Sequence, residues 1–132
     1  MAIHNDIGKI GEDLAVKWLV DKGYQMVTRN YRKPFGEIDI VARETRGRIH
    51  FVEVKSVSYE TRDLLEYAVS HETWRPEEMV HREKQRRFKN IIQTWLSESP
   101  NIIDFQIDII TVRLVPREKY ARISIIENVI FD

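Results

Sequence analysis

Charged residues interrupt two short apolar stretches of this sequence, and no other feature constrains the fold as strongly. One stretch is Ile38-Asp39-Ile40-Val41 and the other is Phe51-Val52-Glu53-Val54-Lys55. Both have the length and composition of buried strands. Burial of an unpaired charge costs several kcal/mol, so a central strand carries one only where it is paired or used. The fold must therefore bring partners to Asp39, Glu53 and Lys55.

A short link joins the strand predicted over residues 37–43 to the one predicted over 48–56, which is typical of an antiparallel hairpin. Side chains alternate along a strand, so Glu53 and Lys55 share one face. On the first strand the alternation predicts one face with Glu37, Asp39 and Val41, and another with Ile38, Ile40 and Ala42. Asp39 can then meet Glu53 and Lys55 from the neighbouring strand.

The rest of the chain supplies helices and further strands. Helical spacing predicts a first helix from residue 5 to Gly23, whose core stripe is Ile7, Ile10, Leu14 and Trp18. Further strands are expected over 25–31, 105–114 and 121–128, with a short helix around 64–69 and a longer one over 76–97. The longer helix should face the core with Phe88, Ile91, Ile92, Trp95 and Leu96. The order α-β-β-β-α-β-β predicts an α/β (or α+β) fold, with a mixed sheet flanked by helices, in a single domain over residues 1–132.

Composition narrows the class of protein. The 132 residues are 42% hydrophobic and 32% charged, which is typical of one globular domain. Cysteine is absent, so any metal must be held by oxygen or imidazole ligands. The sequence has neither a membrane span nor a signal-peptide pattern, so we expect a cytoplasmic protein without membrane contact. A formal net charge of zero argues against a surface that binds nucleic acid all over, but not against a local basic strip.

Two carboxylates and an ammonium at one point suit metal-assisted phosphodiester hydrolysis. Asp39, Glu53 and the Val54 carbonyl would hold Mg²⁺ or Mn²⁺, which would lower the pKa of a bound water. Lys55 would act on the attacking water or on the transition state. Without a cation the carboxylates repel each other, so we expect at least one raised pKa. The alternative is a Glu–Lys pair on an exposed strand, with Asp39 at a strand edge.

The same residues resemble a known nuclease motif. Asp39 and Glu53-Val54-Lys55 resemble the PD-(D/E)xK motif of the restriction-endonuclease-like superfamily. The longer pattern is similar to one family within it, the YraN-like family of uncharacterised bacterial proteins, over nearly the whole chain and in order. The matching pieces are Gly8 to Ala15, Gly23-Tyr24, Asn30-Tyr31-Arg32, Gly36 to Ala42, Phe51 to Lys55 and Asp108 to Val112.

This resemblance implies a fold like that of archaeal Holliday junction resolvases. It also implies a metal-dependent endonuclease that recognises the structure of DNA rather than its sequence, and by analogy a homodimer. Related resolvases complete their acidic site with a glutamate of the first helix, and Glu12 has that place; the alternative is a solvated helix charge. The family usually continues Glu-Val-Lys with Thr or Ala and then Arg, whereas this chain has Ser56-Val57, so a basic residue is missing there.

Other charged residues are candidates for the surroundings of the site. We expect phosphate contacts from a basic run on the later helix and from the turn, namely Lys84, Arg86, Arg87, Lys89 and Arg32. A solvated helix face is the alternative for that run. Glu37 either joins the site or lies in solvent. Asp108 interrupts an apolar strand, and we expect it to be the structural partner of a buried base. The 4 histidines have no metal-ligand spacing.

Three functions compete on this reading of the sequence. The first is a structure-selective DNA endonuclease. The second is a non-catalytic nucleic-acid-binding module that keeps the nuclease fold, and the third is a protein-interaction module that docks a partner through residues 59–82. Asp39, Glu53 and Lys55 favour catalysis, because a binding module has no need for all three.

Overall fold

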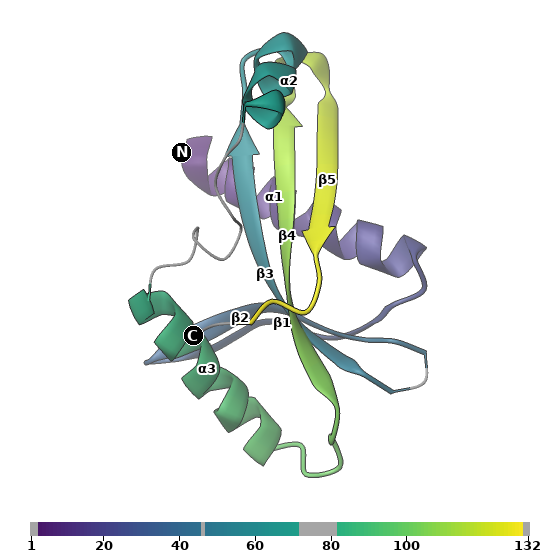
Figure 1. The fold of residues 1–132 in the computed structure, drawn as a ribbon, viewed down its shortest axis with the longest axis vertical. Helices are drawn as coiled ribbons and strands as arrows, with labels where there is room; N and C mark the ends of the chain where they lie inside the picture. The colour runs from purple at the N-terminus through teal and green to yellow at the C-terminus, as the bar shows by residue number, and fades with distance from the viewer. Residues whose placement is uncertain (1–2, 46, 72–81, 131–132) are drawn as a thin grey trace.

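A mixed five-stranded sheet forms the centre of the molecule in the computed structural model, which describes residues 3–45, 47–71 and 82–130 (Figure 1). Its strands, in spatial order, are β1 (Gln25–Lys33), β2 (Gly36–Arg43), β3 (Ile49–Ser58), β4 (Phe105–Val115) and β5 (Tyr120–Ile126). β3 and β4 run parallel, and the other neighbouring strands run antiparallel. The predicted α/β class with a mixed sheet is confirmed.

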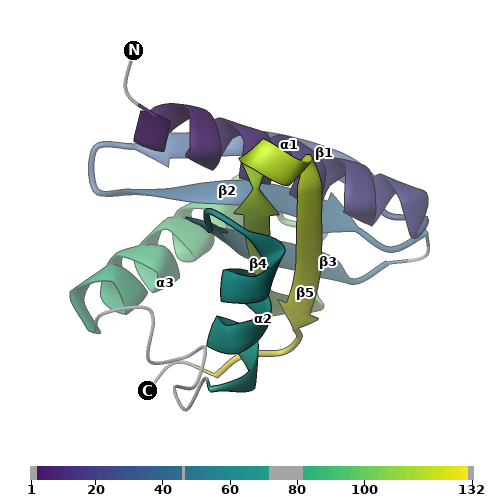
Figure 2. The ribbon, with the colours of Figure 1, turned by 90° about the horizontal axis from the view of Figure 1, so that it is seen from above.

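Helices cover both faces of this sheet. Figure 2 shows α1 (Ile3–Asp21) along one side, with α2 (Arg62–Ser70) and α3 (Arg82–Ser97) on the other. Both α2 and α3 lie in the connection from β3 to β4, which has to cross over because those strands are parallel. The predicted order of elements is confirmed, and a 3₁₀ turn, η2 (Pro116–Glu118), precedes β5. The start of the predicted later helix, before residue 82, lies outside the described residues.

None of the helices in the described ranges is long and apolar enough to cross a membrane.

The contact of α1 with the sheet corrects the predicted core stripe. Ala15 and Leu19 are fully buried in line with Gly11, whereas Ile10 of the predicted stripe is 45% exposed. A Cβ at Gly11 would lie 1.8 Å from the Ser56 hydroxyl of β3, so only glycine allows the helix to come this close. The other members of the predicted stripe are partly buried around this line: Ile7, Leu14 and Trp18.

The opposite face of the sheet packs against α3. The helix buries Phe88, Ile91, Ile92 and Trp95, with Leu96 partly buried, as predicted. Strand β2 departs from the predicted alternation, because Ile38 packs with Val41 on the α3 side while Ile40 packs on the α1 side. The ladder between β2 and β3 ends at the pair Ile40–Val52. The earlier part of β2 keeps only its pairing with β1, and Ile38 there packs against α3.

Candidate active site

A fork between β2 and β3 places Asp39 beside the middle of β3. The antiparallel pairing of these strands runs from Arg43–Ile49 to Ile40–Val52 and stops there. Beyond that point the backbone N–H of Val54 donates to Asp39 Oδ2 over 2.9 Å. A side-chain carboxylate thus replaces the next strand partner and is held where the two strands part.

Glu53 lies next to this fork, on the side of β3 that faces α3. It is only 7% exposed, and its Oε1 lies 2.5 Å from Lys84 Nζ in the first turn of α3. Burial disfavours the charged ammonium, but its hydrogen bond to Glu53 and the charges of Glu53, Asp39 and Glu37 outweigh that effect and raise the pKa of Lys84. Lys84 was predicted from the sequence to bind a phosphate, and its contact with Glu53 was not predicted.

Asp39 holds its charge less readily than an ordinary aspartate. Burial and then the charge of Glu53 raise the pKa of Asp39 to about 7, against the opposing effect of the Val54 N–H. The charges of Glu37 and Glu12 add to the increase. A raised pKa was expected from repulsion between carboxylates, and burial is the larger cause. A cation beside Asp39 would favour the ionised form again.

Glu12 lies at the margin of the site. Its side chain is 17% exposed, and its Oε1 accepts hydrogen bonds from Arg29 Nη2 and from Asn30 Nδ2, each over 3.0 Å. Both donors come from β1, where Asn30 has a left-handed backbone with φ of 52°. Glu12 is near enough for its charge to affect Asp39. The structure therefore places Glu12 beside the carboxylates, with one oxygen held by β1.

Lys55 comes two residues after Glu53 on β3 and is exposed. Strand alternation puts both side chains on the α3 side, where the neighbour of Lys55 on β4 is Thr111. Arg113 follows on the same face of β4, is buried, and is the cross-strand neighbour of Val57. The chain therefore carries an arginine beside the position where a basic residue was missing from β3. Arg113 was not predicted from the sequence, because only the register of β3 with β4 brings it beside Val57.

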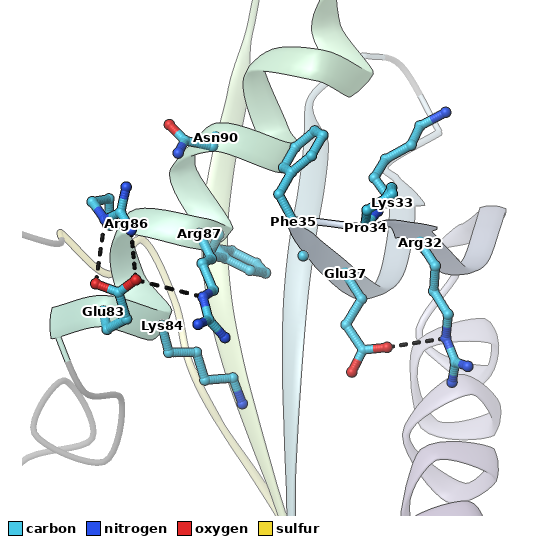
Figure 3. Close-up of a pocket in the computed structure, with 12 residues that line it drawn as sticks. Arg32, Lys33, Pro34, Phe35, Glu37, Glu83, Lys84, Arg86, Arg87 and Asn90 are labelled. Carbon is cyan, nitrogen blue, oxygen red and sulfur yellow. Dashed lines mark hydrogen bonds and ion pairs between the residues drawn. The ribbon is translucent and has the colours of Figure 1, made fainter.

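A cleft of about 730 Å³ opens between the turn that joins β1 to β2 and the first turns of α3 (Figure 3). Gly36 lies where the turn meets the helix, since a Cβ there would come within 3.2 Å of the Arg87 carbonyl oxygen. The basic residues that line the cleft are Arg32, Lys33, Lys84, Arg86 and Arg87, and the acidic ones are Glu37 and Glu83. The lining is thus net positive in a chain whose formal net charge is zero.

The cleft collects most of the residues predicted to bind phosphates. Arg32, Lys84, Arg86 and Arg87 line it, whereas Lys89 is exposed outside the lining. Ion pairs hold the three arginines of the cleft: Arg32 with Glu37 at 3.1 Å, and Arg86 and Arg87 with Glu83 at 2.5 and 3.6 Å. Figure 3 shows Lys84 extending from α3 toward the side of the cleft that carries Glu37.

A second buried polar cluster lies near the start of β3. His50 is fully buried, with Nδ1 2.6 Å from Asp108 Oδ2 and Nε2 2.5 Å from Glu44 Oε2. The other oxygen of Asp108 accepts hydrogen bonds from Gln106 Nε2 at 2.7 Å and from the Asn128 N–H at 3.0 Å. The prediction that Asp108 partners a buried base is confirmed, and the base is His50.

The His50 cluster also contains a potential set of metal ligands. His50, Asp108 and Glu127 place ligand atoms within 4.8 Å of one another. Burial disfavours a charged ring, but the hydrogen bonds to Asp108 and Glu44 outweigh it and raise the pKa of His50. Both ring nitrogens of His50 already contact carboxylates, so the ring has no free nitrogen for a metal. We therefore interpret this cluster as a structural ion network.

Comparison with known proteins places these features in a wider group. The chain matches the family described as "Uncharacterised protein family UPF0102" over residues 11–112, a segment that contains Glu12, Asp39, Glu53, Lys55 and Lys84. It is 36% identical to a UPF0102 protein of Dictyoglomus turgidum over 115 residues, which cover 86% of this chain and 87% of that relative. A UPF0102 protein of Thermodesulfovibrio yellowstonii is 32% identical over 126 residues, or 96% of each chain. One of Rhodococcus opacus is 38% identical over 99 residues, covering 75% of this chain and 74% of the relative.

Proposed function

This chain belongs to the uncharacterised protein family UPF0102, and from that premise we propose that it is a metal-dependent nuclease that acts on DNA. The observation that carries the proposal is the meeting of Asp39 and Glu53 at the fork between β2 and β3, next to a basic cleft. Asp39 accepts a single backbone N–H there, and Glu53 pairs with a lysine that is largely in solvent. Their burial is therefore better explained by a ligand than by packing.

The donor set at the fork fits a hard divalent cation. Asp39, Glu53 and the carbonyl of Val54 would hold Mg²⁺ or Mn²⁺, with Glu12 at the margin, because these ions prefer oxygen ligands. The raised pKa of Asp39 supports this fit, since it reflects a carboxylate short of positive charge. When bound, the cation would supply Lewis-acid stabilisation of the phosphate and a water of lowered pKa.

The remaining roles fall to basic side chains. Lys55, two residues from Glu53 on the same strand face, would orient the attacking water or stabilise the charge that develops on the phosphate. Arg32, Arg86 and Arg87 would bind the phosphate backbone in the cleft. Contacts with phosphates position a strand without reading its bases, so we expect selection by DNA structure, such as branches or flaps, rather than by sequence.

A non-catalytic nucleic-acid-binding module is the second candidate function. The basic cleft favours it, because the positive lining would bind phosphates whether or not the fork holds a cation. The Lys84–Glu53 pair also gives Glu53 a partner within the chain. The two candidates differ in whether Asp39 and Glu53 are required for anything that happens to the nucleic acid.

A cleavage assay tests the proposal. Branched, flapped and single-stranded DNA would be incubated with the protein in Mg²⁺ or Mn²⁺, with RNA in parallel. We expect cleavage of at least one DNA by the wild type and by the control Asp21→Asn, which changes an exposed carboxylate at the far end of α1. Asp39→Asn and Glu53→Gln should abolish it. Binding without cleavage of any substrate would replace the nuclease with the binding module.

A further inference from the structure

Lys84 belongs to two features at once, since it contacts Glu53 at the fork and also lines the basic cleft. The two members of the pair differ in exposure. The Glu53 side chain is nearly buried on a central strand, whereas the Lys84 side chain is 59% exposed on the first turn of a helix. Only Lys84 can leave the contact without disturbing the core, because its four-carbon stem is flexible and solvent reaches it.

Glu53 Oε1 is the oxygen for which two positive charges would compete. Lys84 Nζ lies 2.5 Å from this atom. A divalent cation held by Asp39 and Glu53 would occupy the same neighbourhood and repel the ammonium. Cation binding at the fork therefore opposes the Lys84–Glu53 pair.

The other cations of the cleft do not face this competition. Arg86 and Arg87 pair with Glu83, Arg32 with Glu37 and Lys33 with Glu98. These carboxylate partners all lie outside the proposed ligand set. An ammonium released from Glu53 would remain in the cleft that it already lines, where a phosphate attracts it.

We propose that Lys84 exchanges partners: it leaves Glu53 when a cation binds there, and then contacts a phosphate of the DNA strand in the cleft. This exchange rests on the proposed function. The exchange makes cation binding and DNA binding cooperative. The cation engages Glu53 and the phosphate engages Lys84, so whichever ligand binds first breaks the Lys84–Glu53 pair for the other. Such coupling is reciprocal. The contrary view is that Lys84 remains on Glu53 and only fastens α3 to β3.

The first test is calorimetric titration of Mn²⁺ into the free protein. Lys84→Met removes the competing ammonium from an exposed position, so the variant should bind Mn²⁺ about fivefold more tightly, at the low end of couplings between sites. Arg87→Met removes a charge from the same helix and cleft but leaves Glu53 paired, and should stay within about twofold of wild type. Binding of equal strength by wild type and Lys84→Met would overturn the exchange alone. Failure of the wild type to bind Mn²⁺ would instead remove the proposed function.

The second test is a double-mutant cycle on DNA binding in EDTA, read from the anisotropy of a labelled single-stranded oligonucleotide. In the wild-type background Lys84 is held by Glu53, so Lys84→Met should cost little affinity. In the Glu53→Gln background Lys84 is free to reach a phosphate, and Lys84→Met should cost about fivefold more than in the wild type. An equal loss in the two backgrounds would mean that Lys84 does not exchange partners. Because the cycle needs no cation, its outcome does not depend on cleavage.

Discussion

His50 and Glu53 are both buried on β3, yet their surroundings compensate charge to different degrees. His50 has a carboxylate at each ring nitrogen, and Asp108 in turn accepts hydrogen bonds at both oxygens. At the fork, Asp39 accepts one backbone N–H, and Glu53 pairs with a lysine that is largely in solvent. The consequence is visible in Asp39, whose pKa is raised to about 7 by burial and by Glu53.

This difference separates a structural cluster from a candidate binding site. A buried charge that is fully paired stabilises one arrangement of the chain, and its removal damages the fold. A buried carboxylate that lacks a full complement of partners costs stability, and such sites are found where a ligand supplies the missing charge. Substitutions at the fork should therefore affect function, and substitutions in the His50 cluster should affect folding.

The largest expected effect is on catalysis at the fork. Lys55→Ala should lower the rate of DNA cleavage about 10²–10³-fold, because its ammonium would act mainly on the transition state. The melting temperature should hardly change, since Lys55 is exposed. Lys17→Ala, which removes an exposed lysine of α1 that does not line the cleft, is the matched control and should keep the wild-type rate. Cleavage by Lys55→Ala at the wild-type rate would show that Lys55 has no catalytic role.

The next effect is on folding at the His50 cluster. Asp108→Ala should lower the free energy of unfolding by about 3 kcal/mol, because it leaves a buried imidazolium and two hydrogen-bond donors without their acceptor. Urea denaturation measures this loss. A loss below about 1 kcal/mol would put the cluster in the same class as the fork.

The pH dependence of stability sharpens the same comparison. The pKa of Asp39 is raised from 3.8 to about 7 by folding, so the folded protein binds the proton more tightly than the unfolded chain does. The stability of the wild type should then fall as the pH rises from 4 to 7. Asp39→Asn should remove this slope and be more stable than wild type at pH 8 by about 1–2 kcal/mol.

Two features make that prediction specific. Asparagine keeps an oxygen for the Val54 N–H, so Asp39→Ala, which loses the oxygen, should be less stable than Asp39→Asn. The pKa of His50 is raised, so the stability that its charge contributes is lost as the pH rises above 6.5. Asp39→Asn should still show this fall in stability. Thermal unfolding between pH 4 and 9 measures both. A wild-type slope that persists in Asp39→Asn between pH 4 and 7 would contradict the assigned cause.

The smallest expected effect is on the salt dependence of DNA binding. Arg87→Ala should flatten the plot of log affinity against log salt concentration by about 1, the slope of one phosphate contact. Arg48 contacts Asp104 and Gln106 beside the His50 cluster, and Arg48→Ala should leave the slope unchanged. Equal effects of the two substitutions would show that the cleft is not the preferred path of the strand.

Local pattern was enough to predict some of these residues and not others. Asp39, Glu53 and Lys55 stood out because a charge inside an apolar strand is visible in the sequence itself. The mixed sheet and the order of the elements were predicted from strand alternation and helical spacing, which are also visible in the sequence itself. Ile38 was assigned to the wrong face, because the point at which β2 leaves β3 depends on pairing and not on the residues of β2 alone.

Contacts between distant segments lay beyond the reach of such patterns. The Lys84–Glu53 pair depends on how α3 docks, and the neighbourhood of Val57 and Arg113 depends on the parallel register of β3 and β4. A basic partner was expected for Asp108. Only the register of β3 with β4 shows that this partner is His50. The line of contact of α1 was missed because it is set by Gly11, a residue without a hydrophobic side chain.

The central claim is that Asp39 and Glu53 hold a divalent cation, and a thermal-shift titration with Mn²⁺ tests it most directly. At pH 8, where Asp39 is mostly ionised, saturating Mn²⁺ should raise the melting temperature of the wild type and of Lys55→Ala by mass action. The rise should vanish in both Asp39→Asn and Glu53→Gln. A rise that survives both substitutions would contradict the claim and place the cation elsewhere, with His50, Asp108 and Glu127 as the next ligands to examine.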